Sequence, residues 1–331
     1  MTIVRAIVEK IMSEIIYRGR RAHQIENGQL QVVVLVEGGH IAAITHLGTG
    51  INPLWTPPWA TIEPSTYDPV RHPEYGLGSE SRLLAGIHGH NLCLDTFGAP
   101  SEAEAAAGAM VHGEAGVIPW TIKSGADTLL AEVETAPLRF ARRLRLDGER
   151  LYFEETLTNL SGEDRPVAWT EHVTLGPPFL EAGQTQFAAR AVRDQDLEDG
   201  VHQHVTLERF TGAPSASGYT TYLMDPSREH AHFLAYSPWH QLLLGYVWRT
   251  ADFPWLGTWE EHLERKILPW NGRTETRGME FGVSPFPESR RAMIDRGRLF
   301  GVPTYRWLSA GETITVNYYA FLKTATHLPE R

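Results

Sequence analysis

The sequence is dominated by short runs in which apolar and polar residues alternate, separated by turns rich in glycine or proline. Residues 29–48 contain two such runs around a Gly-Gly pair, and residues 139–163 contain two more around Asp147-Gly148. Another run occupies residues 312–323. Alternation with a period of two is typical of strands that bury one face, and Asp-Gly between two such runs indicates a hairpin. With 30 Gly and 21 Pro, the pattern predicts an all-β sandwich or barrel of antiparallel strands.

Three stretches depart from this pattern. In the N-terminal segment, residues 1–20, apolar residues fall at helical spacing, which predicts a short helix, although β-branched residues leave a strand open as an alternative. Residues 101–110 are a second short helix candidate. Residues 53–73 are rich in proline and aromatic residues, which indicates a long ordered loop that forms one wall of a site. We see no fixed repeat or flexible linker and therefore expect one β-sandwich domain over residues 1–331.

Composition and charge restrict the possible partners and the compartment. The formal net charge is −10 and no block of Lys and Arg stands out, so we expect neither nucleic acid nor an anionic membrane surface as a partner. No apolar run approaches the roughly 20 residues of a membrane span. Cys93 is the single cysteine, which excludes an intramolecular disulfide and is typical of a protein of the reducing cytoplasm. The sequence leaves the oligomeric state open.

Two predicted strands carry polar side chains on a face that suits a ligand better than a core. In residues 165–183, alternation places His172 on a face with small and polar neighbours, opposite Trp169. In residues 276–288 it places Glu280 between two glycines, which leaves room for a ligand beside the carboxylate. A partly enclosed Glu can act as a base near neutral pH. Alternatively, either side chain lies on a solvated strand face.

Two His-Gly pairs lie upstream of these strands. His88 and His90 form a His-x-His pair that could begin a metal site with Asp95, but the other glycine and histidine positions of a cupin metal site are missing. We therefore expect no metal here and assign His88, His90 and Asn91 to substrate contacts. The second pair begins at His112 and is followed by Trp120.

Aromatic residues crowd the last third of the chain. Residues 252–264 hold Trp255 and Trp259 in a loop-like context, together with acidic residues such as Asp252 and Glu260. Sugar C–H faces stack on indole rings while the hydroxyls need polar partners, so we assign these four side chains to substrate binding. Packing in the protein interior is the alternative for the tryptophans.

Three motifs together resemble the aldose 1-epimerase (galactose mutarotase-like) family: "VHGEAGVIPW" (residues 111–120), "WTEHVTLG" (169–176) and "GMEFGVSPFPE" (278–288). Their order matches the family's order, and the resemblance spans residues 25 to 325. It implies a large antiparallel β supersandwich. It also implies that His172 is the general acid, that Glu280 is the general base and that His112 holds and polarises the sugar.

The resemblance implies an isomerase of carbohydrate metabolism that interconverts the α and β anomers of a sugar by acid–base ring opening. Neither a metal nor an organic cofactor is required for that reaction. Two other function classes remain open: a carbohydrate-binding protein without turnover, and a hydrolase, lyase or sugar-phosphate epimerase on the same fold. Glu260 and Glu261 would be available carboxylates for hydrolysis.

Overall fold

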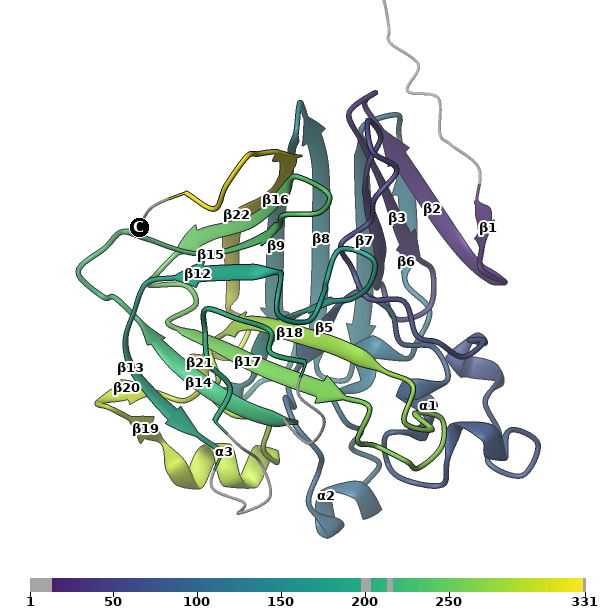
Figure 1. Ribbon diagram of the computed structural model, residues 1–331. Helices are drawn as coiled ribbons and strands as arrows, with labels where there is room; N and C mark the ends of the chain where they lie inside the picture. Colours follow the sequence, from purple (N-terminus) through teal and green to yellow (C-terminus); the bar gives the residue numbers. More distant parts are fainter. Residues whose placement is uncertain (1–13, 198–203, 213–216, 330–331) are drawn as a thin grey trace, which may run out of the picture.

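The computed structural model describes residues 14–197, 204–212 and 217–329, and two large antiparallel sheets dominate it (Figure 1). The first sheet has ten strands. In spatial order these are β1 (Ile15–Tyr17), β2 (Arg20–Glu26), β3 (Leu30–Leu35), β4 (Ile41–His46), β5 (His90–Leu94), β11 (Trp169–Leu175), β18 (Glu275–Gly282), β17 (Trp255–His262), β14 (Gly218–Met224) and β13 (Ala191–Asp196).

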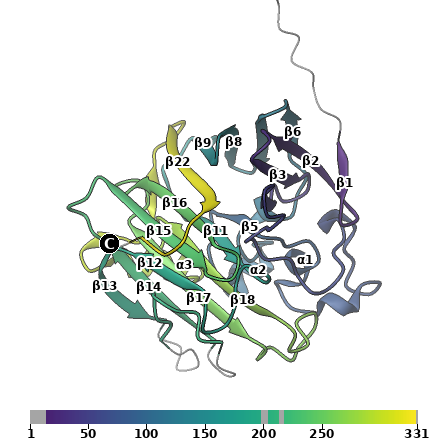
Figure 2. The same cartoon turned by 45° about the horizontal axis from the view of Figure 1, so that its top comes forward.

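The second sheet has eight strands and packs against the first. In spatial order these are β12 (Gln186–Ala189), β15 (His230–Ser237), β16 (Leu242–Arg249), β22 (Thr313–Thr324), β9 (Arg150–Asn159), β8 (Leu138–Asp147), β7 (Thr128–Thr135) and β6 (Thr121–Ser124). Two views of the ribbon show the green strands of the middle of the chain on one side and the purple N-terminal strands on the other (Figures 1 and 2).

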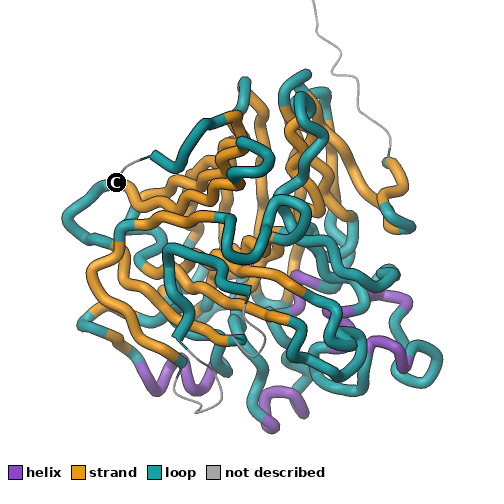
Figure 3. The backbone as a smooth tube through the Cα atoms, in the orientation of Figure 1, coloured by secondary structure: helices purple, strands orange, loops and turns teal. Residues whose placement is uncertain are grey.

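Helical turns are short and lie along one edge of the molecule (Figure 3). They are α1 (Ser81–Leu84), α2 (Glu102–Ala106), α3 (Arg290–Arg296) and the 3₁₀ turns η1 (Pro64–Thr66), η2 (Pro73–Tyr75) and η3 (Glu114–Gly116). Two small sheets pair β10 (Arg165–Val167) with β21 (Arg306–Leu308), and β19 (Arg298–Leu299) with β20 (Val302–Pro303). In the described part of the chain, no helix has the length and hydropathy needed to cross a membrane.

The principal core lies between the two large sheets. In β8 and β9 every second side chain is buried, as the alternation in residues 139–163 predicts. The central strands β11 and β18 differ because nearly all of their residues are buried. One face of each strand packs into the inter-sheet core, for example Trp169 and Phe281, while loops cover the other face. This second, loop-covered face of the first sheet is where a cavity forms.

The predicted fold class is confirmed, and so are several local predictions. The Asp147-Gly148 turn joins β8 to β9 with Gly148 at φ +59°, which a glycine adopts without steric strain. A helix forms at α2, where Ser101 and Glu104 make a capping box. Residues 53–73 form an ordered loop between β4 and α1.

The N-terminal helix prediction has a different outcome. Residues 1–13 lie outside the described residues. The following residues, Ile15–Tyr17, form strand β1 and pair with β2, so for this part of the segment the helix prediction is wrong and the strand alternative holds. The physical reason is the exposed edge of β2, which offers backbone hydrogen bonds that a β-branched sequence accepts readily.

Candidate active site

The site begins as one row of residues that crosses four strands of the first sheet. His172 on β11 lies directly opposite Asn91 on β5 and Glu280 on β18, and Glu280 in turn lies opposite Gly257 on β17. Cα partners in neighbouring strands share a face, so the three polar side chains point to the same side of the sheet. The predicted faces of both strands are therefore observed.

His172 and Glu280 touch each other. The Nε2 atom of His172 lies 3.0 Å from Oε1 of Glu280, and both side chains are almost fully buried. Nδ1 of His172 lies 2.9 Å from the hydroxyl of Thr174, two residues along the same strand face. When Glu280 is ionised, this contact places a proton on Nε2 of His172, and the Thr174 hydroxyl is the partner of the other ring nitrogen.

His112 reaches the same place from a loop. Its ring centroid lies 4.8 Å from that of His172. The His112 backbone has φ +61°, and the Leu94 N–H donates a 3.1 Å hydrogen bond to its carbonyl oxygen. Burial lowers the pKa of His112 well below its ordinary value, and nearby His172 and His40 lower it further. His112 is therefore neutral at pH 7 and can donate or accept one hydrogen bond through each ring nitrogen.

The glycine of the His-Gly motif has a steric role. Gly113 has φ +80°, and a Cβ atom there would overlap the carbonyl oxygen of Leu94. Only glycine permits the tight approach of this loop to β5 that brings His112 over the sheet. Trp120 supports the same loop from within, since its Nε1 donates a 2.9 Å hydrogen bond to the Ala115 carbonyl.

A cavity of about 550 Å³ opens over His112, His172 and Glu280. This size falls within the range of small-molecule sites. Its wall is mainly aromatic and apolar and includes Trp55, Val111, Tyr219, Trp259 and Trp270. Glu80 and Arg265 also line it, and because each side chain is 34% exposed they lie at its rim.

Arg265 is held at the rim by several partners. Its guanidinium lies over the rings of Trp259 and Trp270, at 5.4 and 4.8 Å from their centroids, and within 4.0 Å of the carboxylates of Glu261 and Glu80. The positive charge at the mouth is therefore already compensated by two acids.

The sequence predicts that Gly278 and Gly282 leave room for a ligand beside Glu280, and the structure shows a different role for them. A Cβ atom at Gly278 would overlap the Glu280 carboxylate, and one at Gly282 would overlap Thr170. The space beside Glu280 is thus filled by its own side chain and by Thr170, and the room for a ligand comes from the cavity above.

The structure brings one of the assigned binding residues, Trp259, to the cavity, where its ring centroid is 6.3 Å from that of His172. Asn91 lies beside His172 in the sheet but does not line the cavity, and neither polar atom of its buried amide has a partner among the described residues. Trp255 shares this sheet face, yet its Nε1 donates to the Pro303 carbonyl, which covers it.

The other assigned binding residues lie away from this cavity. Glu260 is on the opposite face of β17, within 3.1 Å of Arg277 and 2.8 Å of His262. His90 is on the opposite face of β5, within 2.7 Å of Glu171. Asp252 lines a separate cavity of about 640 Å³. The structure therefore does not place these three side chains with His172.

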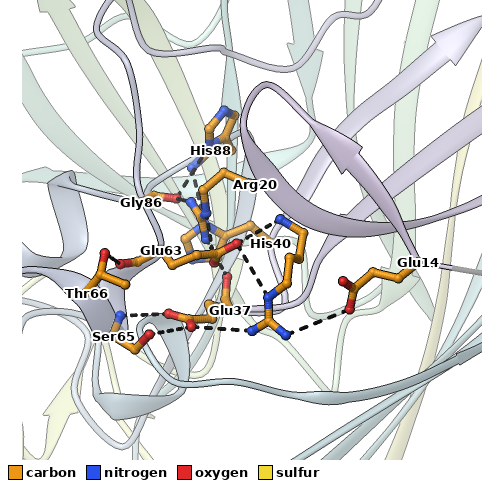
Figure 4. Close-up of polar contacts among 10 residues, drawn as sticks. Glu14, Arg20, Glu37, His40, Glu63, Ser65, Thr66, Gly86 and His88 are labelled. Atoms are coloured by element: carbon orange, nitrogen blue, oxygen red, sulfur yellow. Dashed lines mark hydrogen bonds and ion pairs between the residues drawn. The ribbon is translucent and has the colours of Figure 1, made fainter.

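His88 lies in a third environment, near a buried arginine (Figure 4). Arg20 binds Glu63 and the carbonyls of Gly86 and Glu37 at 2.8–3.1 Å. Burial lowers the pKa of His88 to about 3, so its ring is neutral. Its backbone N–H donates to Nδ1 of His40 at 3.2 Å. This cluster ties the N-terminal strands to the loop before β5.

Asp95, the third member of the rejected metal set, is paired with Arg165 at 2.6 Å and Arg290 at 3.2 Å. Among the described residues, no group of three or more His, Cys, Asp or Glu side chains is placed to hold a metal ion.

Sequence reasoning missed several cavity residues. Trp55 comes from the proline-rich loop that was expected to wall a site, so that signal was present without the residue being singled out. Trp270 lies in the last third of the chain, where aromatic residues are frequent, and its local sequence does not distinguish it from the other tryptophans there. Glu80 and Arg265 lie in loops whose sequences have no periodicity, and nothing in those sequences indicates that they meet.

No protein-family model and no curated protein matches the sequence. Solved structures do match. A protein of Klebsiella pneumoniae described as a candidate aldose 1-epimerase has a TM-score of 0.72 at 16% identity, with 93% of this chain and 80% of that chain covered. A galactose mutarotase-like protein of Clostridium acetobutylicum has a TM-score of 0.64 at 13% identity, with 94% and 98% covered.

These similarities cover almost the whole chain. At 13–16% sequence identity they show that the fold is shared. In this chain the ten-stranded sheet and the loops that cover it bring His112, His172 and Glu280 to one cavity. The chain has the fold of the aldose 1-epimerase and galactose mutarotase-like proteins.

Proposed function

We propose that the protein is an aldose 1-epimerase-like enzyme that interconverts the α and β anomers of a free sugar. The observation that carries the proposal is the contact between Nε2 of His172 and Oε1 of Glu280 on the floor of an aromatic cavity, with His112 beside it. A proton donor and a proton acceptor on one sheet face are the two groups that ring opening of a hemiacetal needs.

The reaction follows from these positions. The Glu280 carboxylate takes the proton of the anomeric hydroxyl while His172, protonated on both nitrogens, gives its Nε2 proton to the ring oxygen. The bond between C1 and the ring oxygen breaks, and an open-chain aldehyde forms. Rotation about the C1–C2 bond presents the other carbonyl face, and reclosure returns each proton to the group from which it came. The C1–O bond that breaks forms again on reclosure, and proton transfers without any change of oxidation state are sufficient, so we propose no metal and no cofactor.

His112 and Trp259 complete the proposed site. Neutral His112 can hold a sugar oxygen next to His172 by a hydrogen bond, and Trp259 offers an indole ring against a sugar C–H face. The hydrolase alternative is less well supported, since Glu260 is paired with Arg277 on the far side of the sheet and Glu261 accepts the backbone N–H groups of Glu264 and Arg265.

The direct test is anomer exchange. With purified protein, we expect saturation-transfer NMR or polarimetry to show faster α–β interconversion of at least one hexose in a panel of free sugars. If calorimetry shows that a sugar binds but no sugar exchanges its anomers faster, the protein is a carbohydrate-binding protein and not an enzyme of this type. Failure of both measurements across the panel would overturn the proposal.

Trp259→Ala is expected to raise KM for the sugar about 2- to 12-fold with a smaller change in kcat, if one aromatic contact is worth about 0.5–1.5 kcal/mol. Trp239→Ala is the matched control, because Trp239 is 81% exposed and does not line the cavity. Michaelis–Menten analysis of both variants checks the expectation, and an equal effect in the two variants would contradict it.

A further inference from the structure

The strand that carries His172 is anchored from its other face by a buried ionic cluster. Arg142 on β8 contacts Oε2 of Glu171 through Nη2 and Oε1 of Glu155 through Nε, each at 2.6 Å. All three side chains are fully buried. Glu171 directly precedes His172 and points into the space between the two large sheets.

The cluster connects both sheets. On the side of the first sheet, Glu171 accepts from Nε1 of Trp169 at 3.0 Å and from Nε2 of His90 at 2.7 Å. On the side of the second sheet, Glu155 accepts from the Tyr318 hydroxyl at 2.7 Å. The titratable and charged groups that face one another here come from six strands: His90 (β5), Arg142 (β8), Glu155 (β9), Glu171 (β11), Tyr246 (β16) and Tyr318 (β22).

The charges of this cluster balance only if it holds a proton. Two carboxylates face one guanidinium, and burial, with Arg142 nearby, lowers the pKa of His90 well below its ordinary value, so His90 adds no positive charge. An unpaired charge in a dry interior is strongly unfavourable. One proton on one of the two carboxyl groups therefore has to balance the charge that a second cation would otherwise supply.

Glu155 is the position with room for that proton. Both oxygens of Glu171 already accept hydrogen bonds, whereas Oε2 of Glu155 is buried and has no donor partner among the described residues. Burial raises the pKa of Glu155 to about 8; Arg142 opposes this shift, and the charge of Glu171 reinforces it. A proton on Oε2 of Glu155 can be donated to the neighbouring carboxylate of Glu171.

We propose that Arg142, Glu155 and Glu171 form a clamp between the two sheets that retains one proton on Glu155 and thereby positions β11 and its catalytic His172. Arg142, Glu155 and Glu171 are positioning residues, because they touch the back of the strand and not the cavity. The effect on catalysis rests on the proposed function; the effect on stability does not.

The same substitution, Glu to Gln, at Glu155 and at Glu171 distinguishes the roles of these two residues. Glu155→Gln replaces a protonated carboxyl by an amide that can still accept from Arg142 and Tyr318 and donate toward Glu171, so we expect a stable protein with kcat within about 3-fold of wild type. Glu171→Gln places an amide NH₂ against the donors of Arg142, His90 or Trp169. We expect it to lower Tm at every pH and to reduce kcat by about 10-fold or more, with a smaller change in KM.

The pH dependence has a definite sign. A carboxyl whose pKa is raised on folding binds more protons in the folded protein, so its contribution to stability declines as pH rises from about 4.5 to about 8. Between pH 6 and pH 9, the wild-type Tm should therefore fall relative to that of Glu155→Gln by roughly 5 °C. The wild-type kcat should also decline above pH 8 where that of Glu155→Gln does not.

Thermal melts and kcat profiles from pH 6 to pH 9.5 on the full chain test the clamp. Superimposable Tm and kcat profiles for wild type and Glu155→Gln, or equal losses in the two Gln variants, would overturn it. If Glu171→Gln does not fold, the wild-type and Glu155→Gln comparison decides alone. If no sugar is turned over, the proposed function fails, while the melts still decide whether the proton is held.

Discussion

Glu280→Gln should lower kcat for anomer interconversion by about 10²–10⁴-fold, the contribution of one positioned base, without loss of the fold. The amide keeps the size of the side chain and can still contact His172, but it cannot take the proton of the anomeric hydroxyl. Saturation-transfer NMR on the most active sugar measures the rate, and a thermal melt establishes that the variant remains folded.

Glu275→Gln is the matched control for this experiment. Glu275 begins the same strand, carries the same charge and does not line the cavity. Its rate should remain close to wild type. An unchanged rate in Glu280→Gln would remove the base from the proposed reaction, and equal losses in both variants would point to a general charge effect instead.

Gly113→Ala should damage both stability and activity. Its φ of +80° with a ψ of 173° lies in a region that is essentially restricted to glycine, which alone costs an alanine about 1–3 kcal/mol. The added Cβ atom would also overlap the carbonyl oxygen of Leu94, so β5 and the loop must separate. We expect a total cost on the order of 3 kcal/mol or more. Displacement of His112 by about 1 Å should reduce kcat by roughly 10²-fold.

Gly108→Ala distinguishes the cost of the backbone conformation from the cost of the overlap with Leu94. Gly108 has φ +92°, but a Cβ atom there would meet nothing within 4 Å. This variant should show the conformational cost alone and keep its activity. Urea unfolding and anomer-exchange rates measure both effects. If the two variants lose stability equally, the close approach of Gly113 to Leu94 contributes nothing.

The alternation of apolar and polar residues predicted the strands well because the direction of a side chain in a strand depends only on its position among a few consecutive residues. Alternation along residues 165–183 and 276–288 predicted the strand faces of His172 and Glu280, and the register of β11 with β18 then puts them opposite each other beside one cavity. The hairpin at Asp147-Gly148 follows in the same way from turn chemistry. Alternation alone leaves Glu171 either as a buried, paired acid or at an edge of the sheet, and the structure shows the buried, paired acid.

The binding residues were harder to assign because neighbours in sequence separate in space. Trp259 and Glu260 are adjacent, yet one lines the cavity and the other faces Arg277 across the sheet. Reading 252–264 as a loop hid the alternation of β17, which would have divided these residues between two faces. His90 and Asn91 are divided by β5 in the same way.

The sequence alone determined the all-β class, the strand faces of His172 and Glu280, and the hairpin turn at Asp147-Gly148, because period-two burial and turn chemistry act over a few residues. Only the tertiary structure decided which loops wall the cavity, that Arg265 meets Glu80 at its rim, and that Arg142, Glu155 and Glu171 share one buried network. Those contacts join segments far apart in the chain, and their energies come from burial and charge pairing, which no local pattern records.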